Sequence, residues 1–151
     1  PFDIVITTNS GYPLDRNLYQ SVKGMSAASR IIREGGSIIL AAECRDGIPD
    51  GQYAYLLKGA SSPEALLEAI HAPGYLKRDQ WQAQIQAQIQ QHADVYVYSE
   101  YLSDQQIHQA LLKPCRNIPE TVSALLRKYG KNARIGVLPE GPQTIPCLQP
   151  P

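Results

Sequence analysis

The chain has 151 residues, and its 14 Lys and Arg residues balance 14 Asp and Glu residues, so the formal net charge is zero. Its size and ordinary apolar fraction predict one globular domain over residues 1–151. No cluster of basic residues interleaved with aromatics is visible, which argues against nucleic acid or an anionic membrane as partner. No apolar run approaches the roughly 20 residues of a membrane span and no basic-then-apolar leader is visible, so we expect no membrane partner and a cytoplasmic location.

The first part of the chain predicts a strand, a tight loop and a helix start. A β-rich run covers residues 4–8, a loop containing Gly and Pro covers residues 9–15, and a helical pattern begins near Asp15. In an open α/β sheet, ligands bind beyond the carboxyl ends of the strands, where a helix N-terminus offers free N–H groups. The loop over residues 9–15 is therefore a candidate site for a carboxylate or phosphate.

The helix that follows, expected to end at Gly35, carries an apolar stripe and a neighbouring polar stripe. The apolar stripe should face the core: Leu18, Val22, Met25 and Ile32. The neighbouring stripe holds Tyr19, Lys23, Ser26 and Arg30. Because Gln20 lies three residues before Lys23, and Tyr19 four before it, a hydroxyl, an amide and an ammonium can converge on one small polar ligand near the strand end. The alternative is that Lys23 and Gln20 only solvate an exposed helix face, as these residue types usually do.

A continuous apolar run over residues 37–42 predicts a buried parallel strand. Glu43 and Cys44 follow it, at the edge where sites gather. No His lies nearby in sequence to activate the thiol, so Cys44 is expected to be a small buried side chain, and Glu43 keeps only a minor claim as a cleft residue. Residues 47–60 contain Gly, Pro and Tyr and predict an irregular surface loop.

Two helices are expected next. A Ser-Ser-Pro-Glu start predicts the first, from residue 61 to about Ile70, and Asp79 is expected to cap the second, DQWQAQIQAQIQQ. Trp81 recurs with two isoleucines at every fourth position of the second helix, which predicts an apolar stripe packed on the sheet. Trp81 is then a core anchor, or alternatively a residue whose ring or indole N–H reaches a cleft.

The remaining patterns alternate in the same way. Residues 94–99 and 134–138 predict strands, and helices are expected over residues 103–112 and 119–130. This order predicts an α/β fold, a three-layer sandwich with a mainly parallel sheet of about four strands and helices on both faces. No G-x-G-x-x-G or P-loop follows the first strand, so a nucleotide site is not supported.

Cysteine and histidine spacing indicates neither disulfides nor metal ligation. Free thiols are predicted for the three cysteines, Cys44, Cys115 and Cys147. The histidines show no ligand-type spacing, so the sequence predicts no metal site.

One long pattern supports a family resemblance. TTNSGYPLDRNLYQSVKGMSAA, at residues 7–28, resembles the C-terminal domain of the nickel-pincer-dependent lactate racemase family, and the similarity continues through EGGSIILAAECRDG, DQWQAQIQAQI and VLPEGPQTIP. The resemblance implies a racemase or epimerase (an isomerase) of 2-hydroxy acids that works by hydride transfer to a nickel-pincer nucleotide. Matched by motif, the implied substrate-binding residues are Tyr19, Gln20, Lys23 and Trp81.

In that family the N-terminal domain holds the cofactor and the acid/base histidines. The resemblance therefore implies that this chain, which begins at Pro1 without Met, is an excised C-terminal domain. Its partners would be the N-terminal domain and a small 2-hydroxy acid; alone it would lack cofactor and catalytic residues and be inactive. The alternative is a non-catalytic binding or interaction domain that uses the loop over residues 9–15 for a small anion.

Overall fold

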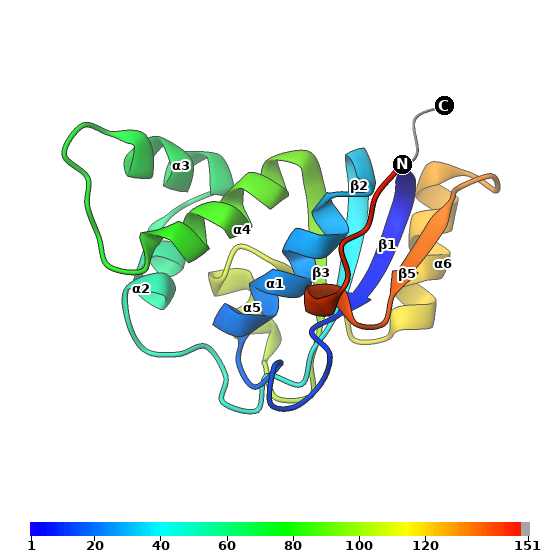
Figure 1. The fold of residues 1–151 in the computed structure, drawn as a ribbon, viewed down its shortest axis with the longest axis horizontal. Coiled ribbons are helices and arrows are strands. Elements are labelled where there is room, and N and C mark those ends of the chain that lie inside the picture. Colours follow the sequence, from blue (N-terminus) through cyan, green and yellow to red (C-terminus); the bar gives the residue numbers. More distant parts are fainter. Residues whose placement is uncertain (149–151) are drawn as a thin grey trace.

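The computed structural model describes residues 1–148, which form an α/β fold around a five-stranded parallel sheet (Figure 1). The strand order is β4-β3-β2-β1-β5, and every neighbouring pair is parallel. The strands are β1 (Phe2–Thr8), β2 (Ile32–Ala41), β3 (Ala93–Tyr98), β4 (Lys113–Pro114) and β5 (Ile135–Leu138). The predicted fold class is confirmed.

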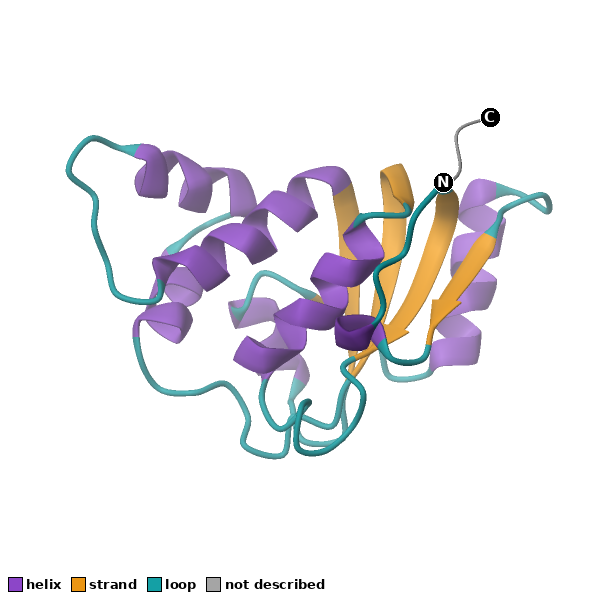
Figure 2. Cartoon of the chain, in the orientation of Figure 1, coloured by secondary structure: helices purple, strands orange, loops and turns teal. Residues whose placement is uncertain are grey.

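The helices lie on both faces of this sheet (Figure 2). They are α1 (Leu18–Ser29), α2 (Gln52–Gly59), α3 (Pro63–His71), α4 (Gln80–His92), α5 (Asp104–Gln109) and α6 (Ile118–Tyr129), followed by the 3₁₀ turn η1 (Gly141–Gln143). Helices α1 to α5 contribute to the main core on one face, whereas α6 alone packs on the opposite face. The chain therefore forms three layers, with the larger helical layer on the α1 side.

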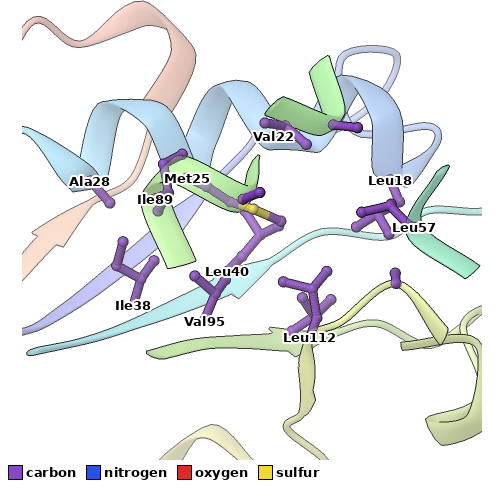
Figure 3. Packing of buried hydrophobic residues seen from close by; sticks show 14 of the residues in the cluster. Leu18, Val22, Met25, Ala28, Ile38, Leu40, Leu57, Ile89, Val95 and Leu112 are labelled. Carbon is purple, nitrogen blue, oxygen red and sulfur yellow. The ribbon is translucent and has the colours of Figure 1, made fainter. Parts of the chain in front are cut away.

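The core follows from the alternation of side chains along the strands. Ile38 and Leu40 of β2 point toward α1, whereas Ile39 between them joins the cluster under α6. Figure 3 shows Met25 of α1 lying close to Leu40 of β2, and Val22 belongs to the same core cluster. The predicted apolar stripe of α1 is confirmed for Leu18, Val22 and Met25, which are at most 1% exposed.

Helix α1 is shorter than predicted at both ends. It begins after Asn17, whose side chain accepts the N–H of Gln20 at 3.0 Å, and not near Asp15. Asp15 is instead buried, and its Oδ2 accepts the N–H of Glu43 at 2.9 Å. At the other end Ile32, predicted to be helical, pairs with β1 as the first residue of β2.

Two further elements differ from the predictions. Residues 52–59, predicted to be irregular, form α2, because Tyr53, Leu56 and Leu57 at helical spacing bury one face in the main core. Residues 113–114, for which no strand was predicted, pair with β3 as the short edge strand β4. Two residues, one of them Pro114, are too few to carry a strand pattern in sequence.

Candidate functional site

Two of the four resemblance-implied residues, Lys23 and Trp81, line one groove, which we call the α1–α4 groove. It is a hollow of about 290 Å³ between α1, α4 and the C-terminal segment around η1. Helices α1 and α4 contact each other, and η1 contacts α1 (Figure 1). The polar and aromatic lining residues are Lys23, Ser26, Arg30, Trp81, Gln82 and Thr144.

Helix α1 presents its polar stripe to this groove. The ammonium of Lys23 donates to Oε1 of Gln20 at 2.8 Å, so the predicted proximity of these two side chains is confirmed. Lys23, Ser26 and Arg30 all line the groove, as expected for one helical stripe. Gln20 does not line it and acts on it through Lys23.

Tyr19 reaches the groove through Trp81. The two rings pack edge to face, with centroids 6.0 Å apart and planes at 81°, and Tyr19 makes a second such contact with Tyr53 at 5.3 Å. Burial, and then the charge of Asp79, raise the pKa of Tyr19 above its ordinary value. The phenol of Tyr19 therefore stays protonated at neutral pH, and its ring supports Trp81 through the edge-to-face contact.

Of the two alternatives stated for Trp81, the structure does not support a core anchor. Trp81 is 51% exposed and lines the groove, while Gln82 and Gln86 are 1% and 0% exposed. The buried face of α4 thus carries Gln and Ala rather than Trp81 and its isoleucine partners, of which only Ile89 is buried. The amide of Gln82 donates to the backbone carbonyl of Tyr19 at 2.7 Å, which orients α4 so that Trp81 points to the groove side. At its start, Asp79 takes a left-handed conformation and makes no side-chain cap, contrary to prediction.

A close backbone approach sets the third wall. A Cβ on Gly141 would lie 2.5 Å from the carbonyl oxygen of Thr8, and one on Gly24 would lie 2.6 Å from the same atom. Only glycine at both positions allows η1 to pack against α1 at this distance. The groove therefore depends on three segments that are far apart in sequence. No periodic pattern in the sequence of the C-terminal segment indicates that it lines the groove.

The loop over residues 9–15 lines a different cavity, of about 490 Å³, beyond the carboxyl ends of β1, β2 and β3. Three carboxylates line it, from Asp15, Glu43 and Glu100, and among the described residues no Lys or Arg does. Lys23 thus does not share a cavity with this loop, contrary to the prediction of one site at the strand end. Of these carboxylates, Glu43 is paired with Arg45 at 2.8 Å, so the described lining of this cavity offers no free cation for a small anion.

The chemistry of the remaining reactive side chains is unremarkable within residues 1–148. No group of three or more His, Cys, Asp or Glu there is placed to hold a metal ion. All three cysteines are free, as predicted. Cys44 is buried, and burial raises the pKa of its thiol to about 11, so it is not an activated nucleophile.

None of the described helices is long and apolar enough to cross a membrane.

Sequence and structure comparisons agree on a single family. Residues 1–145 match the family described as "Lactate racemase C-terminal domain". The lactate racemase of Thermoanaerobacterium thermosaccharolyticum is 35% identical over 147 residues, which cover 96% of this chain. That of Lactiplantibacillus plantarum is 38% identical over 142 residues, covering 92% of this chain.

The same relationship appears in three dimensions. The structure of the lactate racemase apoprotein from T. thermosaccharolyticum superposes with a TM-score of 0.86 at 35% identity, over 93% of this chain and 34% of that one. The chain spans about a third of the length of both relatives, 34% and 33%.

Proposed function

The chain belongs to the lactate racemase C-terminal domain family, and from this premise we propose that it is the substrate-side domain of a two-domain 2-hydroxy-acid racemase or epimerase. The observation that supports this proposal is the α1–α4 groove, where the ammonium of Lys23 and the half-exposed ring of Trp81 line one hollow. A small hydroxy acid has the matching features, a carboxylate and a short carbon chain.

Each residue has a role that its contacts allow. Lys23 would bind the substrate carboxylate through a charge-assisted hydrogen bond, and Gln20, already bonded to Lys23, would orient the ammonium. Trp81, supported edge-on by Tyr19, would exclude water from the reacting carbon. Tyr19 and Gln20 are then positioning residues.

The cofactor would belong to the rest of the complete protein. By the resemblance it is a nickel-pincer nucleotide held by an N-terminal domain, and when bound it would supply a reversible acceptor for the hydride of the hydroxy-bearing carbon. The groove residues of this chain do not fit nickel, since they offer cations, hydroxyls and an amide but no imidazole, thiolate or carboxylate. They fit an anionic substrate instead.

The three free thiols favour a reducing compartment such as the cytoplasm.

The test is a chiral assay of the complete, cofactor-loaded protein on enantiopure 2-hydroxy acids, starting with lactate. We expect the opposite enantiomer to appear, and Lys23→Ala to lower kcat/KM by about tenfold or more, because charge-assisted hydrogen bonds contribute roughly 1.5–3 kcal/mol. Lys58→Ala is the matched control, since Lys58 is exposed on α2 and outside the groove. Equal activity of the Lys23 and Lys58 variants would reject the substrate contact. No turnover of any hydroxy acid would favour a non-catalytic binding domain.

A further inference from the structure

The α1–α4 groove contains a second cation that a simple hydroxy acid does not use. Arg30 lines the groove together with Lys23, and no carboxylate lines it among the described residues. Neither side chain forms an ion pair within residues 1–148, whereas Arg33, three residues after Arg30, pairs with Asp3 at 2.5 Å. The groove therefore carries two positive charges without a protein counter-charge.

The spacing of the two cations fits one extended ligand. Lys23 lies in α1 and Arg30 is the C-cap residue of that helix, still in the right-handed helical conformation. Their separation of seven residues is close to two full helical turns, so both face the same side, with Cα atoms separated by about 10 Å along the axis. Ser26 lies between them on the same wall, and Thr144 also lines the groove. A chain with an anionic group at each end can engage both cations, whereas a monocarboxylate leaves one of them unpaired.

From this arrangement we infer that Arg30 is a specificity-determining residue and that the preferred substrate is a 2-hydroxy acid with a second carboxylate at its far end. The inference rests on the proposed function and deepens it. Lys23 binds the carboxylate next to the reacting carbon, and the planar guanidinium of Arg30 binds the distal carboxylate through two parallel hydrogen bonds. The apolar side chains of Ile85 and Ile145, which also line the groove, contact the methylenes between the two carboxylates.

The experiment compares matched acids on the complete protein. The dicarboxylates are 2-hydroxyglutarate and 2-hydroxyadipate, and their counterparts 2-hydroxypentanoate and 2-hydroxyhexanoate have the same number of carbons but end in a methyl group. We expect higher kcat/KM on the dicarboxylates. Arg30→Gln should lower that value by about tenfold or more for the dicarboxylates and by less than about twofold for the monocarboxylates. Arg30→Lys should restore part of the loss, because it restores the charge without the planar fork.

A control and a second readout separate the possible failures. Arg127→Gln removes the same charge from the exposed surface of α6, on the other face of the sheet, and should change neither class of acid. Calorimetric titration of the same proteins with each acid measures binding without turnover. Equal losses on both classes, or no preference for dicarboxylates in either readout, would overturn the inference. Dicarboxylate binding that depends on Arg30, without turnover of any acid, would instead refute the proposed reaction while keeping the charge recognition.

Discussion

Buried glutamine side chains determine how α4 sits on the sheet. Gln86 is fully buried; its Oε1 accepts the hydroxyl of Tyr53 at 2.6 Å, and its Nε2 donates to the carbonyl of Ala110 at 2.7 Å. Gln82 and Gln90 make similar amide-to-carbonyl bonds to Tyr19 and Leu111. One helix is thus bonded to α1, α2 and the end of α5 by side chains that are usually exposed.

We predict that Gln86→Ala destabilises the fold by about 2–4 kcal/mol, because it leaves the hydroxyl of Tyr53 and a buried carbonyl without partners. Gln88→Ala makes the same chemical change two residues further along α4, on its exposed face. Its free energy of unfolding should stay within about 0.5 kcal/mol of that of the unsubstituted protein. Urea unfolding of the three proteins measures the difference. Similar midpoints for both variants would show that the buried bonds contribute nothing net.

At the same scale, sequence reasoning located part of the groove. The i, i+3 and i+4 spacing of Tyr19, Gln20 and Lys23 correctly placed Gln20 beside Lys23, since helical geometry alone determines that contact. Sequence reasoning left two alternatives open for Trp81, a core anchor or a residue that reaches a cleft, because a period-four apolar pattern by itself assumes that large apolar residues face inward. In α4 the small Ala83 and Ala87 and the bonded glutamines occupy the inner face, and Trp81 is left at the groove.

Helix α6 alone covers the second face of the sheet. The cluster beneath it contains four buried residues, Ile4, Ile39, Cys115 and Leu125, against 28 in the main core. Leu125 is the only buried side chain that α6 itself supplies. Four partly buried α6 side chains also pack against this cluster: Ile118, Val122, Leu126 and Tyr129. Helix α6 is therefore held by Leu125 and these contacts, together with the ion pair of Lys128 with Asp94 at 3.1 Å and the bond of Tyr129 with Ser37 at 2.7 Å.

We expect Leu125→Ala to lower the free energy of unfolding by about 2–5 kcal/mol, since the cavity it creates cannot be filled by a neighbouring helix. Leu76→Ala is the control, because Leu76 is 86% exposed between α3 and α4 and should cost less than about 0.5 kcal/mol. Thermal and urea unfolding test both variants. A small cost for Leu125→Ala would mean that α6 is held mainly by its other contacts.

Caps and glycines marked the ends of α3, α5 and α6 correctly, whereas Asp15 and Gly35 did not mark the ends of α1. Ser62 and Ser103 cap α3 and α5 as expected, and Gly130 ends α6 with a positive φ of 94°. Helix α2 was missed because its Gly and Pro neighbours are typical of a loop, and its apolar face is visible only once the main core is known. Residues 32–34 were assigned to α1 because local pattern cannot show that Ile32 pairs with Phe2 of β1 and begins β2.

At the scale of the molecule, opposite charges gather in two different cavities. Lys23 and Arg30 line the α1–α4 groove, whereas Asp15, Glu43 and Glu100 line the cavity beyond the carboxyl ends of the strands. The alternation of elements correctly predicted the parallel sheet, because crossover connections leave few other arrangements. The alternation of elements did not predict which of the two cavities is lined by cations, because the cationic lining depends on the packing of α1 against α4 and η1.

Ionisable groups inside the main core make the whole fold sensitive to alkaline pH. Burial raises the pKa of Cys44 from 9.0 to about 11, and burial also raises the pKa of Tyr53 well above its ordinary value. Between about pH 9 and 11 the unfolded chain loses the Cys44 proton while the folded chain keeps it. The stabilisation is therefore complete below pH 9 and is lost as pH rises through the folded pKa.

We predict that the free energy of unfolding falls by about 2–3 kcal/mol over this range on account of Cys44, since one pKa unit corresponds to about 1.4 kcal/mol. Tyr53 adds a decrease of the same sign from about pH 10. Cys44→Ser removes the titrating thiol and should flatten the curve between pH 9 and 10, where Tyr53 contributes least. Cys147→Ser is the matched control, because Cys147 is exposed and its removal should leave the slope unchanged. Urea unfolding at each pH distinguishes the variants, and parallel curves for all three proteins would show that Cys44 ionises freely in the folded state.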